Sequence, residues 1–256
     1  MEKLDKTIQG IGNRIEVLSM GMFDKHGHGT GVATAACGQQ NDKASCGVNP
    51  KAQVFPIKIS DGKAGGPAPS DDLAMTAAMM VMYQKGTRII NISYGPLMEQ
   101  SEHRVLHAMF RDWFERKDGL VFISAGNAGE KLGSRDEAYI NVVSAMGKVD
   151  NEMVLANNGM WSSASGPCVD FTAPGQGIQC ASPSGRSISM DGTSLSTPLC
   201  SAVASLIWTV NPRLKNTQVI EIMRLACVNT TVGRNNKFGY GMPDAARAVK
   251  IAEASR

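Results

Sequence analysis

Apolar and polar positions divide the chain into short blocks of two kinds. Runs of apolar residues rich in β-branched side chains predict buried strands at four places, Gln53–Ser60, Arg88–Ser93, Leu120–Ala125 and Ile140–Ala145. Apolar residues at helical spacing predict helices in the intervals and near the end, at Ser70–Gln84, Ser101–Lys117 and Asn216–Val228. Ser194–Val210 is apolar on almost every face, which predicts a helix buried in the core.

Strands that alternate with helices predict an α/β fold with a mainly parallel sheet. No repeat, low-complexity stretch or linker interrupts residues 1–256, so we expect a single domain. Ligands of such sheets bind where the chain leaves the carboxyl ends of the strands. The segments to inspect are therefore 93–95, 126–129 and the turn before Ser194.

Composition excludes several classes of protein. Apolar residues make up 43% and charged residues 19%, as in soluble globular chains. The longest apolar stretch, around 202–210, is about half of what a membrane span needs. The net charge is only +3 and no basic stripe is present, which argues against nucleic acid as a partner. The first ten residues lack the apolar centre of a signal peptide. Oligomeric state is left open.

Cysteine and histidine spacing gives no metal site. The six cysteines contain no CxxC pair. Cys37 and Cys46 bracket a short polar loop, so a disulfide and two free thiols are both open there. Cys200 and Cys227 lie in apolar helical stretches and are interpreted as core thiols. His103 and His107 are four residues apart but lack a third ligand, and we interpret them as surface residues of a helix.

Three glycine-rich strings carry residues suited to acyl transfer. They are Gly27–Ala33 with His28, Ser124–Gly129 with Asn127, and Asp191–Pro198 with Ser194. A serine hydroxyl becomes a nucleophile when an imidazole can take its proton. The oxyanion that develops needs fixed donors, such as a side-chain amide and a backbone N–H. Gly192 and Thr193 suit a tight turn into a helix N-terminus, and Gly126 leaves room for substrate backbone beside Asn127.

Together these strings resemble the signature blocks of the subtilisin-like serine proteases. HGTGVA resembles the histidine block, SAGN the asparagine block and GTSLSTP the serine block. GVNPKAQVFPIKI, IINISYG, VDFTAPG and FGYGMPDAARAV are also similar to family segments, so the resemblance runs from about Asp24 to Ala248. It implies a three-layer fold, with a mainly parallel twisted sheet between helices. Residues 1–23 match poorly.

Carried over by position, the resemblance implies a role for each motif. Ser194 is the nucleophile, His28 the general base and then acid, and Asn127 an oxyanion donor beside the Ser194 backbone N–H. One wall of the specificity pocket is formed by Ser93, Tyr94 and Gly95. Gly65 and Gly66 pair with substrate backbone as an extended edge.

The sequence departs from the family in its acidic residue. The family's triad runs Asp, His, Ser in chain order, and its Asp ends a central strand that is followed by Ser-Gly or Thr-Gly. Neither Asp5 nor Asp24 has that context, and Asp24 is interpreted as a carboxylate that orders its loop. We therefore expect the fold to be N-terminally incomplete, with the catalytic Asp upstream of Met1, and this chain to cleave peptides poorly by itself. Leu195 replaces the family's frequent Met, without consequence for the chemistry.

The expected activity is hydrolysis of peptide bonds in polypeptide substrates by a serine endopeptidase. Two alternatives stay open: a catalytically dead homologue that binds peptides, and an exopeptidase of the same fold that resembles tripeptidyl peptidases. No cofactor is required, but the loop Gln39–Asp42 lies where many family members bind calcium, so Asn41 and Asp42 are calcium candidates. The family favours a secreted or cell-envelope location.

Overall fold

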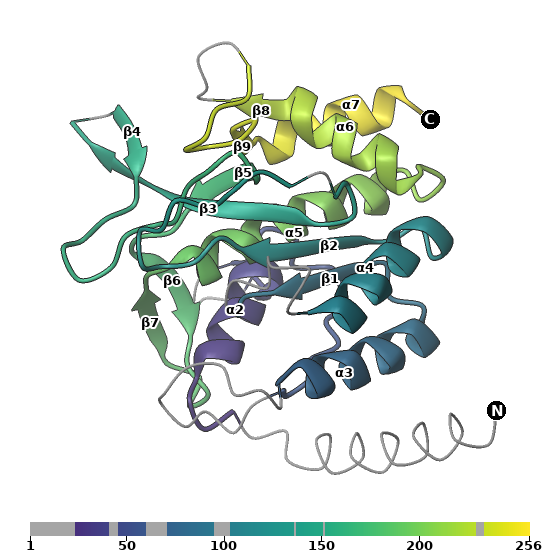
Figure 1. Cartoon of the computed structure of the whole chain (residues 1–256), viewed down its shortest axis with the longest axis horizontal. Coiled ribbons are helices and arrows are strands. Elements are labelled where there is room, and N and C mark those ends of the chain that lie inside the picture. Colours follow the sequence, from purple (N-terminus) through teal and green to yellow (C-terminus); the bar gives the residue numbers. More distant parts are fainter. Residues whose placement is uncertain are drawn as a thin grey trace.

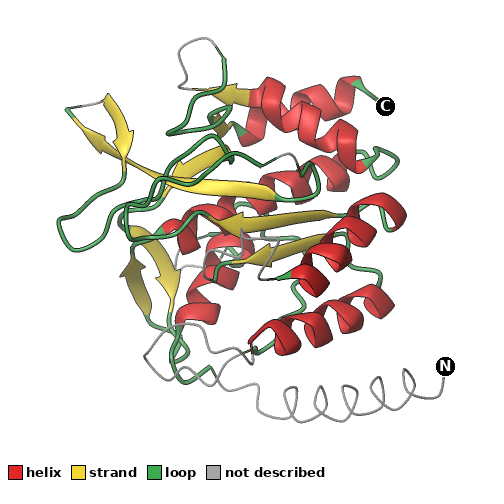
Figure 2. Ribbon diagram, in the orientation of Figure 1, coloured by secondary structure: helices red, strands yellow, loops and turns green. Residues whose placement is uncertain are grey.

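A central sheet with helices on both faces organises the chain (Figure 1, Figure 2). The structure is a computed structural model that describes residues 24–40, 46–59, 71–94, 103–135, 137–150, 152–228 and 233–256. In the first half of the chain, the described residues form three helices: α2 (His28–Cys37), α3 (Asp71–Lys85) and α4 (Arg104–Arg116). The second half contributes α5 (Thr193–Val210), α6 (Asn216–Ala226) and α7 (Ala245–Ala254).

Within the part of the chain that the structure describes, the main sheet has five strands: β1 (Ile89–Ile92), β2 (Leu120–Ser124), β3 (Asn141–Val149), β4 (Glu152–Leu155) and β5 (Val169–Pro174). The pairs β1/β2, β2/β3 and β3/β5 are parallel, whereas β4 pairs with β3 in antiparallel orientation. Two small antiparallel sheets stand apart, one of β6 (Ile178–Ala181) with β7 (Ser187–Met190), the other of β8 (Cys227–Val228) with β9 (Met242–Pro243). The sheet is therefore mainly parallel, as the sequence predicts.

Alternation along the strands produces the three layers. On β2, Leu120 and Phe122 pack into the cluster formed with α5, α6 and α7. Val121 and Ile123, which point to the opposite face, pack into a second cluster with α3 and α4. Successive strand residues face opposite sides of a sheet, so one buried strand supplies both cores. This explains why the strand is apolar throughout rather than alternating with polar residues.

Helix α5 runs through one of these cores. Its length and mean hydropathy of 1.3 would suffice for a membrane span, but 67% of it is buried inside the protein. It is thus twice as long as the apolar stretch at 202–210 suggests. Its N-terminal residues pack against the sheet and against α2, and this places Ser194 at the edge where the parallel strands end.

Most predicted elements are found, with one clear error. The helix predicted from Ser70 ends at Lys85, and Gly86 follows with a φ of +69°, which favours glycine as a helix stop. The segment Gln53–Ser60 is predicted to be a strand, but residues 53–59 form none, and Ser60 lies outside the described residues. Val54 and Phe55 remain 44% and 46% exposed. Among the described residues no strand pairs with this segment, so its backbone lacks the inter-strand hydrogen bonds that define a strand.

Two further expectations are decided by packing. His107 is buried at 1% exposure, not on the surface, because it lies on the inward face of α4, where its Nδ1 is 3.2 Å from the Tyr139 hydroxyl. All six cysteines are free thiols, so Cys37 and Cys46 do not form the disulfide that their spacing allows. Burial raises the pKa of the Cys227 thiol to about 12 and that of Cys200 as well, which keeps both protonated in the core.

Candidate functional site

Ser194 lies in the first turn of α5, shortly after a glycine whose backbone conformation would strain any other residue. Gly192 precedes the helix with a φ of +130°. This turn directs the chain from β7 into α5. The Ser194 N–H belongs to the first helical turn, where backbone amides have no intrahelical acceptor. Ser194 itself is 9% exposed. The local sequence thus presents a hydroxyl and a free amide donor together, at the positive end of a helix dipole.

Asn127 is fixed beside this helix start by Thr193. The Thr193 backbone N–H and hydroxyl both donate to Asn127 Oδ1, each over 2.9 Å. Because a backbone amide can only donate, its partner must be the carboxamide oxygen, and this settles the orientation of the amide. The Asn127 Nδ2 group is consequently left as the free donor on an exposed residue. It lies close to the helix start, 3.4 Å from where a Cβ on Gly192 would stand.

The loop after β2 joins the same network through its glycine. Gly126 donates its N–H to Thr193 Oγ1 over 3.3 Å, and its φ of +111° favours glycine. A single threonine side chain therefore binds two successive residues of this loop. Thr193 was missed as a site residue by sequence reasoning, although a hydroxyl directly before the candidate nucleophile was a signal available in the sequence.

Ser93 binds the opposite side of the helix start. Its hydroxyl donates to the Ser194 carbonyl over 2.7 Å, and the Ser194 hydroxyl lies 3.4 Å from the Ser93 carbonyl oxygen. Tyr94 follows, half-buried. Because β1 and β2 are parallel and adjacent, their ends deliver Ser93 and Gly126 to the same edge of the sheet. The predicted residues Ser93, Gly126, Asn127 and Ser194 are thus brought together by the fold.

His28 is the first residue of α2, and this helix start is fixed by Asp24. One carboxylate oxygen of Asp24 accepts the Gly27 N–H over 2.7 Å. The other accepts the Thr30 N–H over 2.8 Å and the Thr30 hydroxyl over 2.7 Å. These bonds satisfy first-turn amides that would otherwise lack an acceptor. Burial raises the pKa of Asp24, but the hydrogen bonds from Thr30, Gly27 and His26 outweigh it, and the net pKa is lowered.

Helix α2 packs against the helix that carries Ser194. Ala35 and Leu195 share a small buried cluster with Cys180 of β6. Thr34 also accepts the Ala181 N–H through its hydroxyl over 3.0 Å. His28 and Ser194 therefore stand in the first turns of two helices in contact. Among the described residues, no hydrogen bond joins the His28 ring to the Ser194 hydroxyl or to a carboxylate.

The environment of His28 favours the neutral imidazole. Burial is the main cause that lowers its pKa, and the nearby charge of His26 lowers it further. The negative charge of Asp24 acts in the opposite direction but is outweighed. A neutral imidazole can accept a proton at neutral pH, which is what a general base must do.

Several predicted residues lie outside the described part of the chain. They are Gly65 and Gly66, Gly95, the calcium candidates Asn41 and Asp42, and Asp5. Within the described residues, no group of three or more histidines, cysteines or carboxylates could hold a metal ion.

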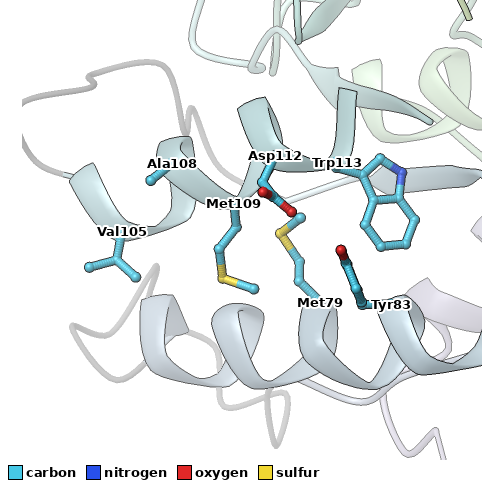
Figure 3. Close-up of a pocket in the computed structure, with 7 residues that line it drawn as sticks. All are labelled: Met79, Tyr83, Val105, Ala108, Met109, Asp112 and Trp113. Carbon is cyan, nitrogen blue, oxygen red and sulfur yellow. The ribbon is translucent and has the colours of Figure 1, made fainter. Parts of the chain in front are cut away.

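A cleft of about 250 Å³ opens elsewhere, between α3 and α4 (Figure 3). Its lining is mainly apolar, from Met79 and Tyr83 on α3 to Met109 and Trp113 on α4. The carboxylate at its rim, Asp112, is bound to Arg116 over 3.1 Å. None of the candidate site residues lines this cleft, so it is separate from the helix start at Ser194.

Known proteins share both the sequence and the fold. The chain matches the subtilase family model over residues 21–241. It is 31% identical over 205 residues to the cell wall-associated protease of Bacillus subtilis, which covers 79% of this chain but 21% of that protein. It is 28% identical over 229 residues to subtilisin Savinase of Lederbergia lenta, which covers 89% of this chain and 79% of that protein. It is also 28% identical to the M-protease of Shouchella clausii, of which the match covers 56%.

Solved structures agree on the architecture. The MycP1 protease of the ESX-1 type VII secretion system has a TM-score of 0.76 at 19% identity, over 90% of this chain and 72% of that one. Sphericase has a TM-score of 0.69 at 23% identity, over 86% of this chain and 78% of that one. At these identities the likeness shows the fold, a three-layer α/β arrangement of the subtilisin type.

Proposed function

Because the chain belongs to the subtilase family of serine proteases, we propose that it acts as an endopeptidase through an acyl-enzyme on Ser194. The observation that carries this proposal is the fixed Asn127 amide beside the first turn of α5. Its Nδ2 group lies close to the turn that begins α5, and the Ser194 N–H in the first turn of that helix has no intrahelical acceptor. This is the arrangement that a developing oxyanion needs.

The proposed reaction begins with the Ser194 oxygen. It attacks the scissile carbonyl carbon while His28 takes the hydroxyl proton, and the carbonyl oxygen becomes the oxyanion. Collapse of this intermediate breaks the C–N bond, and His28 gives its proton to the leaving amine. Water then hydrolyses the acyl-enzyme by the same steps in reverse, again with His28 as base. No step requires a cofactor.

The activity of this chain is proposed to be low because His28 has no orienting acid among the described residues. The Asp24 oxygens already accept three hydrogen bonds from Gly27 and Thr30, so this carboxylate serves the helix rather than the imidazole. In subtilisin, loss of the triad acid alone costs roughly 10⁴-fold in turnover. The same observation favours a second candidate function, a homologue that binds peptides without cleaving them.

Labelling with a serine-directed fluorophosphonate separates the two functions. Intact mass and peptide mapping should locate the adduct on Ser194, and Ser194→Ala should remove it. Ser201→Ala, a buried serine of the same helix, is the matched control and should label like the wild type. An absence of adduct, or an adduct that persists in Ser194→Ala, contradicts the enzyme proposal and leaves the binding function.

The lengths of the products then test the endopeptidase assignment. Digestion of a denatured protein should give fragments of varied length from internal sites. A ladder of tripeptides released from one end would instead identify an exopeptidase of the same fold.

A further inference from the structure

The helix start at Ser194 lies between two loops, which limits where a substrate side chain can go. Ser93 binds Ser194 on one side, and Gly126 with Asn127 binds Thr193 on the other. A scissile carbonyl that reaches Ser194 must place its oxygen at Asn127. The side chain of the same substrate residue starts about 2.5 Å from that carbonyl carbon, since two bonds separate them. It must therefore start close to one of these two loops, at Ser93 or at Gly126 and Asn127.

A carboxylate borders the space beside Gly126. A Cβ built on this glycine would stand 3.5 Å from Glu130 Oε2 and 3.7 Å from the Ala164 methyl group. Ala164 is fully buried, whereas Glu130 is exposed. The Glu130 carboxylate thus lies next to the face of Gly126 that carries no side chain, on an exposed part of the loop.

Hydrogen bonds hold the backbone around Glu130. The Glu130 carbonyl accepts the Ser165 N–H over 3.0 Å, and Gly129 donates its N–H to the Ser162 carbonyl over 2.9 Å. Gly129 has a φ of +72°, the turn that returns the chain towards Gly126. The neighbouring segment 162–165 itself binds the Gly126 carbonyl through the Ala164 N–H over 2.9 Å.

The charge of Glu130 is not neutralised within the described part of the chain. No ion pair or side-chain hydrogen bond there involves its carboxylate. The adjacent cation, Lys131, directs its Nζ to Ser165 Oγ over 2.9 Å. A carboxylate without a partner beside a substrate-binding loop attracts a cation.

We infer that Glu130 selects substrates with a basic side chain, lysine or arginine, at the residue whose carbonyl Ser194 attacks. The aliphatic stem of such a side chain lies along Gly126, and its charged end reaches the Glu130 carboxylate. The inference rests on the proposed function, since it concerns the same site. It gives that function a substrate class.

Peptidyl diphenyl phosphonates test the inference without a need for high turnover. The Ser194 oxygen forms a bond to phosphorus, phenoxide leaves, and His28 takes the proton. Two probes that differ only in arginine or norleucine at the residue next to phosphorus are compared by their labelling rates. The wild type should prefer arginine by at least roughly fivefold, the factor for a pair worth about 1 kcal/mol.

Variants of Glu130 then assign the preference. Glu130→Gln should reduce the ratio of the two rates to about one, and Glu130→Arg should reverse it. Glu253→Gln, the same change on an exposed residue of α7, should keep the wild-type ratio. A ratio near one in the wild type, or an arginine preference that survives in Glu130→Gln, overturns the inference.

Failure of the proposed function gives a different result. A simple fluorophosphonate carries no side chain that could reach Glu130, so it reports only whether Ser194 reacts. If it fails to label Ser194, the proposed function is contradicted. If it labels Ser194 while the two phosphonates react equally, only the role of Glu130 is contradicted.

Discussion

Around Ser194, three loops are joined by hydrogen bonds, whereas His28 depends mainly on one helix end for its position. Thr193 alone binds Gly126 and Asn127, and Ser93 binds Ser194 from the other side. On the His28 side, Asp24 caps α2, and the helix rests on β6 and α5 through small side chains. The serine side is thus preorganised by polar contacts, and the histidine side by the end of one helix.

The difference shows which half of the site can tolerate change. A network of hydrogen bonds fixes atoms in place, and removal of one member leaves others without partners. A helix cap fixes a backbone direction but leaves a ring free to rotate. We therefore expect substitutions on the serine side to alter chemistry strongly, and those on the histidine side to alter stability and reactivity together.

The largest effect is expected from Asn127→Ala. It removes an oxyanion donor and the acceptor of two hydrogen bonds from buried Thr193, so reactivity should fall about 10²–10³-fold and thermal stability should fall as well. The rate of Ser194 labelling by a fluorophosphonate measures the reactivity, and a melting curve measures the thermal stability. Asn236→Ala is the matched control, an exposed asparagine outside the site. Equal labelling by Asn127→Ala and the wild type would remove Asn127 from the oxyanion site.

The pH dependence of labelling tests the environment of His28. Its lowered pKa predicts that labelling falls only below the ordinary histidine value of 6.5, by about tenfold per unit of pH at the acid end. His26→Gln removes a positive neighbour and should move this midpoint upward. The unfolded chain takes up a proton at His28 near its ordinary pKa, before the folded chain does, so stability should also decline as pH falls through that range. A midpoint at or above 6.5 would contradict the burial of the imidazole.

Gly192→Ala tests whether crowding at the helix start disturbs the amide of Asn127. The change costs about 1–3 kcal/mol because a φ of +130° strains any other residue. The new methyl group would be in van der Waals contact with Asn127 Nδ2 at 3.4 Å, and relief of the backbone strain would shift the turn before Ser194, so labelling should fall as well. Gly185→Ala is the control: its φ is +75°, and no atom lies within 4 Å of the new methyl group. It should lose stability and keep its labelling rate, and a parallel loss in both variants would contradict the specific effect.

Asp24→Ala gives the smallest expected effect, a loss of about 1 kcal/mol in the free energy of unfolding at neutral pH. The net pKa of Asp24 is lowered, so its contribution is present above the ordinary carboxyl pKa and disappears as pH falls through the folded value. Denaturant unfolding at several pH values measures this. Asp244→Ala removes a similar cap from α7. Both variants should lose stability, but only Asp24→Ala should label Ser194 more slowly. If the two variants label at the same rate, Asp24 does not fix the position of His28.

Much of this molecule follows from local sequence. Apolar runs such as Leu120–Ala125 predict their own strands, since a buried parallel strand is apolar on both faces. The spacing of Leu106, Phe110 and Trp113 predicts helix α4. Gly86 predicts where the preceding helix, α3, ends. The candidate residues His28, Asn127 and Ser194 were found because glycine-rich turns at element junctions are read directly from the chain.

The tertiary structure alone decided what these residues touch. Gln53–Ser60 has the composition of a strand, yet residues 53–59 form none, because pairing depends on a neighbour that composition does not supply. His107 was predicted to be exposed because the sequence does not show which face of α4 packs on the sheet. The bond from Thr193 to Asn127 joins two loops whose residues are 66 positions apart in the chain. Local patterns encode backbone preference, whereas contacts between distant segments arise only when the sheet brings its strand ends together.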